Sequence, residues 1–239
     1  MPFFGRSGLL AVLLAAAALA LVVPSAGASW SLVMSDNFDG SSVNTTKWKV
    51  YGPNWTGNKG YGLRDGRAIS VGSGLLNITA RMLSGKLVSG GVQSRIDQRY
   101  GRYELRVRTD RDPSLATSGV VLTWPQSGTW PADGENNIYE TMNGATRYPF
   151  HSYVHYCWCN KQYWFTQFAD ASAWHTMVME WEPSAIRMYR DGVRVWTVSD
   201  AYAIPDVAHH LDLQLDAYKN WMSGSVRMQF DYVRIYKRV

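Results

Sequence analysis

Two glutamates and an amide stand close together in one short segment, where they could act on a glycosidic bond. Residues 130–142 read W-P-A-D-G-E-N-N-I-Y-E-T-M and place Glu135 and Glu140 five positions apart, with Asn137 between them. A retaining glycosidase uses such a pair: one carboxylate attacks the anomeric carbon, and the other protonates the leaving oxygen and then deprotonates water, at a separation of about 5 to 5.5 Å. Two solvated glutamates on an exposed strand would give the same pattern, so the motif alone does not decide.

The segment must be extended and irregular if both glutamates serve one site. Ile138 and Tyr139 favour a β-strand. Side chains alternate along an ideal strand, so residues five apart face opposite sides of the sheet. One extra residue, absorbed as a β-bulge, would return Glu140 to the face of Glu135 and Asn137. The sequence therefore predicts a bulged strand whose two carboxylates face one site.

Strand signals fill the rest of the sequence, and no stretch has the periodicity of a substantial helix. Residues 102–109 alternate polar and apolar side chains, and Asp191-Gly192 between two apolar runs is a strong hairpin signal. Further strands are expected at residues 74–81, 174–182, 184–190, 193–198 and 226–237. Many short strands separated by turns predict an all-β sandwich or jelly roll.

The first 28 residues have the composition of a secretory signal peptide. Arg6 precedes an apolar run over residues 9–23, and Ala26-Gly27-Ala28 forms an A-x-A cleavage site. The run is 15 residues long, which is short for a membrane span, although an uncleaved anchor is the alternative. We therefore expect a secreted protein, with no membrane partner after cleavage, whose residues 29–239 form a single domain that acts as a monomer.

Charge and cysteine content argue against nucleic-acid binding and against a metal centre built on thiols. Removing Arg6 leaves 23 basic against 19 acidic residues, and the basic residues are scattered, with no concentrated patch for a nucleic acid. This mild basicity is consistent with an anionic polysaccharide without establishing one. Cys157 and Cys159 are too few for a zinc site, and they form either a small bridge or two thiols.

Aromatic residues are numerous enough to suggest sugar binding. The chain has 11 tryptophans and 14 tyrosines, whose flat apolar faces with one polar group suit sugar rings. Most of them must still pack in the core or along strands. Trp124 and Trp130 flank the loop that leads into the two glutamates, so we expect these two in a cleft.

Several segments, taken in order, resemble glycoside hydrolase family 16, in particular its laminarinase-like members. They are S-D-N-F-D-G-S-S-V-N-T-T-K-W, G-L-L-N-I-T-A-R, S-G-G-V-Q-S-R, Y-G-R-Y-E-L-R-V-R, W-P-A-D-G-E-N-N-I-Y-E, W-H-T-M-V-M-E-W-E-P-S-A-I-R-M-Y-R-D-G-V and F-D-Y-V-R-I-Y. The fifth resembles the family's active-site strand, usually W-P-x-x-G-E-I-D-I-x-E. The resemblance covers nearly all of residues 29–239, and one residue inserted between the glutamates is typical of the laminarinase and agarase branches.

The resemblance implies a concanavalin A-like jelly roll of two curved antiparallel sheets, with a cleft across the concave sheet. It makes Glu135 the nucleophile and Glu140 the acid/base. It places Trp130 against the sugar and His155 near the leaving group.

The resemblance also suggests two further substrate contacts and a metal. Arg95 and Asn54 match substrate-binding positions of the family, and Asp231 matches a position that helps to hold a structural calcium. No other cofactor is implied. The polysaccharide substrate is the one partner that we expect.

Two departures from the family pattern concern the site itself. Asn137 stands where the family usually has aspartate; its NH₂ group can donate to Glu135 and favour the ionised form, but it cannot exchange a proton. We therefore expect an altered pH dependence or a reduced rate, with activity retained. The segment L-D-L-Q-L-D-A-Y replaces a pattern closer to L-x-L-N-L-A-V-G-G, so one end of the cleft, and with it the substrate, is expected to differ.

Two classes of function fit these observations. The first is a secreted retaining hydrolase of β-linked polysaccharide, acting on endo-β-1,3-glucan such as laminarin, and a transglycosylase would need the same residues. The second is a carbohydrate-binding protein with little or no turnover, because a fold alone does not establish catalysis. Both glutamates favour the enzyme, whereas Asn137 favours the binding protein. Motifs of zinc proteases, P-loop proteins and serine hydrolases do not occur in the sequence.

Overall fold

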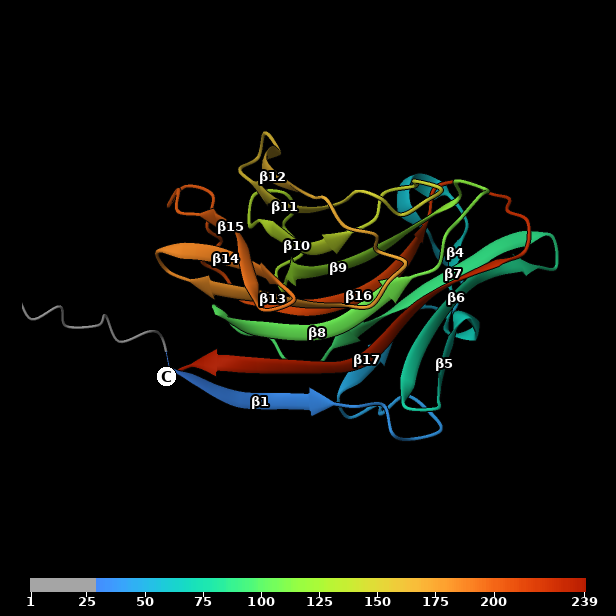
Figure 1. Ribbon diagram of the computed structural model, residues 1–239, viewed down its shortest axis with the longest axis horizontal. Coiled ribbons are helices and arrows are strands. Elements are labelled where there is room, and N and C mark those ends of the chain that lie inside the picture. Colours follow the sequence, from blue (N-terminus) through green and yellow to red (C-terminus); the bar gives the residue numbers. More distant parts are fainter. Residues whose placement is uncertain (1–28) are drawn as a thin grey trace, which may run out of the picture.

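The computed structural model describes residues 29–239, so the expected signal peptide lies outside the described residues. The described chain folds into two antiparallel β-sheets packed face to face, with two short 3₁₀ turns, η1 (Asn58–Gly60) and η2 (Gly66–Ala68). In Figure 1, β1, β17 and β8 run across the lower part of the view, and β9, β10, β11 and β12 lie above them. Within this part of the chain, no helix is long and apolar enough to span a bilayer.

One sheet, here called the back sheet, forms the outer wall. Its strands follow the order β15–β14–β13–β8–β17, and β1 and β6 both pair with the far edge of β17. Strand β5 extends it beyond β6. The bounds are β1 (Trp30–Asp36), β5 (Ile69–Gly72), β6 (Leu75–Leu83), β8 (Gly101–Thr109), β13 (His175–Glu182), β14 (Ala185–Arg190), β15 (Val193–Val198) and β17 (Ser225–Arg238).

The other sheet, here called the cleft sheet, has the order β2–β7–β16–β9–β10–β11–β12. Its strands are β2 (Trp48–Val50), β7 (Lys86–Ser94), β9 (Thr117–Pro125), β10 (Glu135–Glu140), β11 (Phe150–Tyr156), β12 (Lys161–Gln167) and β16 (His209–Ala217). Strand β7 pairs with β6 near its start and with β16 further along, so it joins the two sheets. The short β3 (Trp55–Thr56) and β4 (Leu63–Arg64) attach at this corner, where β4 and β7 pair in parallel.

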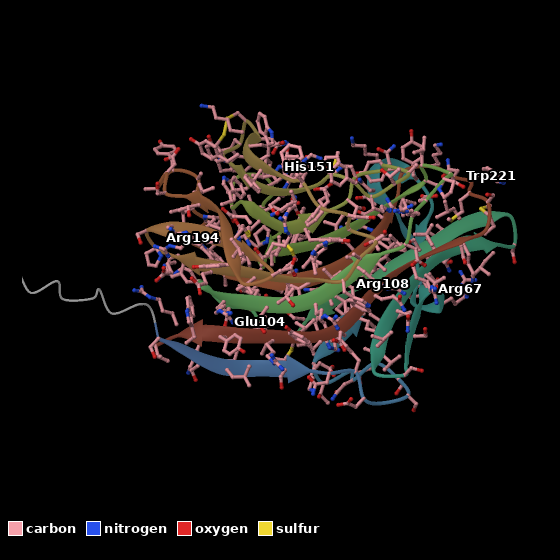
Figure 2. All side chains as sticks on the ribbon, viewed as in Figure 1. Arg67, Glu104, Arg108, His151, Arg194 and Trp221 are labelled. Carbon is pink, nitrogen blue, oxygen red and sulfur yellow. A yellow bond between two sulfur atoms is a disulfide. The ribbon has the colours of Figure 1, made fainter. Side chains whose placement is uncertain are left out.

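Strict alternation of apolar side chains builds the core between the sheets. Tyr103, Leu105 and Val107 of β8 face inward from the back sheet, and the leucines of β16 face them from the cleft sheet. These side chains are buried, and burial of each one stabilises the fold by roughly 1.5 to 3 kcal/mol before entropic costs. Figure 2 shows side chains filling the space between the sheets. The predicted hairpin at Asp191-Gly192 is confirmed, because Arg190 pairs directly with Val193.

Candidate active site

Strand β10 contains the predicted bulge. Against β11, Asn137 pairs with Tyr153 and Glu140 with His151, so one residue of β10 is extra. The bulge makes two consecutive residues, Ile138 and Tyr139, face the core, where both are fully buried. Glu140 thereby returns to the face of Glu135 and Asn137. All three line the same cleft, as the sequence predicted.

A glycine turn delivers Glu135 to the start of this strand. Gly134 has φ 82°, a left-handed conformation that favours glycine. A Cβ atom at this position would lie 2.5 Å from Cγ of Pro205. The glycine before the first glutamate is therefore required by close packing against the loop that precedes β16, as well as by backbone geometry.

The cleft crosses the strands of the cleft sheet and has a volume of about 770 Å³. Trp124 of β9 and Trp130 both line it, as predicted, and their rings stack 6.1 Å apart at an angle of 10°. The Trp130 ring also lies 6.1 Å from the ring of His155. Trp130 remains 39% exposed, so a flat apolar surface is open beside Glu135.

The two glutamates differ in their electrostatic surroundings. Burial raises the pKa of Glu135, while His155 and hydrogen bonds from Asn137 and Trp130 oppose that shift. Burial also raises the pKa of Glu140 to about 8, and the charges of Glu135 and Asp216 add to the shift. Burial thus raises the pKa of both glutamates, and each has a hydrogen bond that favours its ionised form, from Asn137 and Trp130 to Glu135 and from Tyr218 to Glu140.

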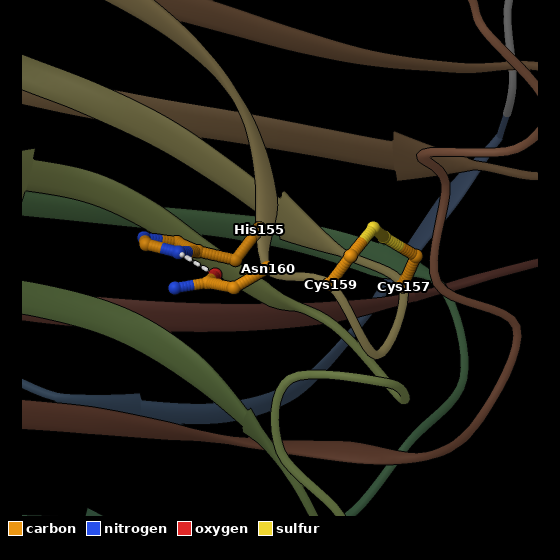
Figure 3. Close-up of a disulfide and its surroundings, with 4 residues drawn as sticks. All are labelled: His155, Cys157, Cys159 and Asn160. Atoms are coloured by element: carbon orange, nitrogen blue, oxygen red, sulfur yellow. Dashed lines mark hydrogen bonds between the residues drawn. A yellow bond between two sulfur atoms is a disulfide. The ribbon is translucent and has the colours of Figure 1, made fainter.

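His155 is held in place by two neighbouring amides. Its Nδ1 lies 2.9 Å from Oδ1 of Asn160, and its Nε2 lies 3.3 Å from Nδ2 of Asn137. In a neutral ring this pattern would place the proton on Nδ1, where it donates to Asn160. Figure 3 shows Asn160 directly beside His155. Their turn is closed by a disulfide between Cys157 and Cys159, which resolves the alternative that the sequence left open.

A chain with two carboxylates in the cleft of a β-sandwich can be compared with known families. The model of glycosyl hydrolases family 16 matches residues 61–234, which is most of the chain and includes the bulged strand. The chain belongs to this family.

Known relatives of this family 16 chain act on different glycans, as their names state. It is 30% identical to a beta-glucanase of Bacillus amyloliquefaciens over 93 residues, which cover 39% of this chain and 38% of that protein. It is 33% identical to beta-porphyranase B of Zobellia galactanivorans over 103 residues, 38% of this chain and 35% of that protein. The matches thus span little more than a third of each relative.

The fold comparison extends over nearly the whole described domain. The laminarinase catalytic domain of Thermotoga maritima superposes with a TM-score of 0.75 at 20% sequence identity, covering 88% of this chain and 99% of that one. The predicted jelly roll is therefore confirmed.

The structure does not bring every residue suggested by the family resemblance into the cleft. Arg95 lies outside the residues that line it, because its Nε donates a hydrogen bond to the backbone oxygen of Thr45, 2.7 Å away. Asn54 also lies outside and accepts a hydrogen bond from Arg67. Its neighbour Trp55 lines the cleft instead. Neither side chain lines the cleft, and a role for Arg95 or Asn54 in substrate binding stays a prediction.

The surroundings of Asp231 do not fit a calcium site. Calcium prefers six to eight oxygen ligands, several of them carboxylates. The Asp231 carboxylate instead pairs with Arg106 on the outer face of the back sheet, at 2.8 Å. Residues 29–239 contain no group of three or more His, Cys, Asp or Glu side chains placed to hold a metal.

The sequence analysis missed the functional side of β16. His210, Asp212, Gln214 and Asp216 alternate with the core leucines and line the cleft floor. The period-two pattern H-L-D-L-Q-L-D in the sequence places these four residues on one face of a strand. The segment was interpreted only as a departure from the family pattern. The two adjacent histidines face opposite sides of the sheet: His209 is fully buried, whereas His210 lines the cleft. Tyr51 and Arg64 were missed as well, because they reach the cleft from distant parts of the chain.

Proposed function

We propose that this family 16 chain is a secreted, retaining, endo-acting hydrolase of β-linked polysaccharide, with β-1,3-glucan as its substrate. The observation that carries the proposal is the bulge in β10, which turns Glu135 and Glu140 into one cleft where their pKa values are set by different neighbours. Export rests on the leader-like residues 1–28. The names of the beta-glucanase and laminarinase relatives support a β-glucan.

In the first step, the Glu135 carboxylate attacks the anomeric carbon and forms a glycosyl ester. The glycosidic oxygen leaves and takes the proton of Glu140, so that Glu140 becomes ionised as the bond breaks. A raised pKa suits this donor, because Glu140 must hold its proton until the transition state. Asn137 donates toward Glu135, which favours the ionised form of the nucleophile against the effect of burial.

In the second step, Glu140 removes a proton from water, and the resulting hydroxide oxygen attacks the same carbon. Glu135 leaves as a carboxylate, so the product keeps the configuration of the substrate. If a sugar hydroxyl replaced the water, the same residues would perform transglycosylation. Trp130 provides the apolar face on which a sugar ring beside Glu135 would stack.

The test is release of reducing sugar from a panel of polysaccharides by purified residues 29–239. The panel contains laminarin, mixed-linkage glucan, a neutral galactan and a sulfated galactan. We expect release from laminarin, with β-configured product by NMR, and loss of release in Glu135→Gln. A product of inverted configuration would contradict the mechanism.

One observation favours a second candidate, a carbohydrate-binding protein without turnover. Asn137 replaces the family's usual aspartate and removes one exchangeable proton from the site. Tight binding of laminarin by the wild-type protein, with no bond cleaved in any member of the panel, would favour this candidate.

A further inference from the structure

A tryptophan on the edge strand of the cleft sheet lies on the face that carries the catalytic strand's polar residues. Trp164 of β12 lies directly opposite Tyr153 of β11, and Tyr153 lies opposite Asn137 of β10. The register between β11 and β12 is regular from Phe150 to Tyr156. Because directly paired residues point to the same face of a sheet, Trp164 shares its face with Asn137.

The neighbours of Trp164 along β12 support this orientation. His155 lies opposite Gln162, and both line the cleft. Trp164 is two positions after Gln162, so it points the same way. Phe165 points to the other face, where its ring stacks 6.2 Å from that of Trp196 in the back sheet. Figure 1 shows β12 at the outer edge of the cleft sheet, above β11 and β10.

Trp164 continues an aromatic surface that begins inside the cleft. The Trp130 ring lies 6.1 Å from the ring of His155, which in turn lies 5.9 Å from the ring of Tyr153. Tyr153 is half-buried, whereas Trp164, its neighbour on the next strand, is 64% exposed. Aromatic side chains therefore extend from Trp130, which contacts Glu135, to the edge of the sheet.

This surface is long enough for more than one sugar ring. Neighbouring strands of a sheet lie about 4.8 Å apart, so the backbone of Trp164 is about 10 Å from that of Asn137, two strands away. That distance exceeds the width of one sugar ring. A ring stacked on Trp164 would therefore be a different ring from the one that Glu135 attacks.

The chemistry of this part of the cleft sheet suits a neutral ligand. The side chains that β11 and β12 place on this face are those of His151, Tyr153, His155, Gln162, Trp164 and Thr166. Within these two described strands, no lysine, arginine, aspartate or glutamate lies on this face. The faces of aromatic rings are electron-rich, so they attract the C–H groups of a sugar and disfavour an anion.

We propose that Trp164 is a sugar-binding residue, on which a neutral ring of the glycan chain stacks two strands away from the ring held at Glu135. The inference rests on the proposed function and deepens it, because it assigns a subsite on β12, outside the residues that line the cleft. A glycan must be several rings long to occupy both positions, which suits an enzyme that acts within long chains.

Binding measured in a cleavage-deficient background tests the inference separately from catalysis. Glu135→Gln is titrated calorimetrically with three neutral hexasaccharides: a β-1,3-glucan, a mixed-linkage glucan and an agarose-type galactan. The sugar that binds most tightly is the reference. Adding Trp164→Ala should weaken its binding about tenfold, because the stacking surface is lost. Adding Trp164→Phe should weaken it less than about threefold, because the phenyl ring keeps a flat apolar face.

Trp174→Ala is the matched control for loss of a tryptophan. The Trp174 ring lies against the guanidinium groups of Arg106 and Arg108 on the outer face of the back sheet, at 5.1 Å and 5.3 Å. Its removal should leave the affinity of Glu135→Gln for the reference sugar within about twofold. Circular dichroism checks that each variant is folded.

Steady-state kinetics with both glutamates intact provide a second measurement. Stacking far from the reacting bond stabilises the bound substrate and the transition state equally, so it affects KM and not kcat. Trp164→Ala should therefore raise KM for the polysaccharide about tenfold and leave kcat within about twofold. A fall in kcat with unchanged KM would contradict the proposed role.

The binding results can overturn the inference without reference to catalysis. Affinity within about twofold of the reference in a folded Trp164→Ala variant would do so, as would equal losses in Trp164→Ala and Trp164→Phe or in Trp174→Ala. Failure of Glu135→Gln to bind any of the three hexasaccharides would overturn it too. If the wild-type protein cleaved nothing while binding still depended on Trp164, hydrolysis would fail as the function and the inference would stand.

Discussion

Acidic residues lie both on the outer face of the back sheet and in the cleft, but their pKa values are shifted in opposite directions. On the back sheet, Glu104 contacts Arg102 at 2.6 Å and Arg234 at 3.2 Å. Burial alone would raise the pKa of Glu104, but these arginines and Tyr232 lower it on balance. In the cleft, burial raises the pKa of Glu140 and of Asp212, each to about 8.

The difference lies in the partners that the fold provides. Every strand of the back sheet that carries an acid places a cation beside it, so those charges are satisfied within the protein. The cleft sheet buries Glu140 and Asp212 with too few partners to offset the effect of burial on their pKa values. Perturbed carboxyl groups in a cleft are therefore a better guide to function than the number of charges on a face.

The largest effect should come from Glu135→Gln. We expect kcat/KM on laminarin to fall at least about 10³-fold, because the nucleophile is removed. Glu104→Gln is the matched change on the back sheet and should leave kcat/KM within about twofold, since Glu104 contacts arginines and Tyr232 on the outer face and does not line the cleft. Comparable losses in both variants would show that the carboxylates of the cleft and of the back sheet do not differ in function.

Glu140→Gln should have the next largest effect and should also change the pH profile. We expect kcat to fall about 10²- to 10⁴-fold, as for loss of a general acid/base. In the wild-type protein, activity should decline as the pH rises through about 8, because Glu140 then loses the proton that it must donate. This alkaline limb should be absent from the residual activity of Glu140→Gln. An alkaline limb of the same midpoint in the variant would assign the titration to another group.

Asn137→Asp should shift the profile without abolishing activity. A second negative charge between the glutamates raises the pKa of each by repulsion. The alkaline limb of kcat/KM is therefore expected to move to higher pH, and the acidic limb with it. Measurement of kcat/KM from pH 4 to 10 decides the matter. An unchanged profile would show that Asn137 does not influence the charge of either glutamate.

Asp231→Asn should have the smallest effect. Its ion pair with Arg106 is more than a third exposed on both sides, so it contributes at most about 1 kcal/mol and its loss should lower Tm by no more than about 4 °C. Activity should be unchanged. Adding a calcium chelator to the wild-type protein should leave Tm unchanged too. A fall in Tm on chelation that Asp231→Asn abolishes would restore the calcium site at this position.

Much of the site could be predicted from residues that are close in sequence. The alternation in residues 102–109 and the hairpin at Asp191-Gly192 follow from local backbone preferences, and both are present as predicted. If Glu135 and Glu140 serve one site, their odd spacing requires a bulge, and the bulge is present. Trp124 and Trp130 flank the same segment and line the cleft. Arg95 and Asn54, suggested by the resemblance alone, do not line the cleft, because a resemblance gives a position in the chain but not the direction of a side chain.

The sequence by itself determined a two-sheet sandwich and the bulged strand with its two glutamates, because period-two patterns and turn residues act within a few positions. Only the tertiary structure decided that β16 lies beside β9, which brings Asp212, Gln214 and Asp216 to the cleft floor. It also decided that Tyr51 and Arg64 reach them across more than 150 residues of chain. Long-range strand pairing leaves no local signal, yet it sets which acids are buried together and so raises the pKa values of Glu140 and Asp212.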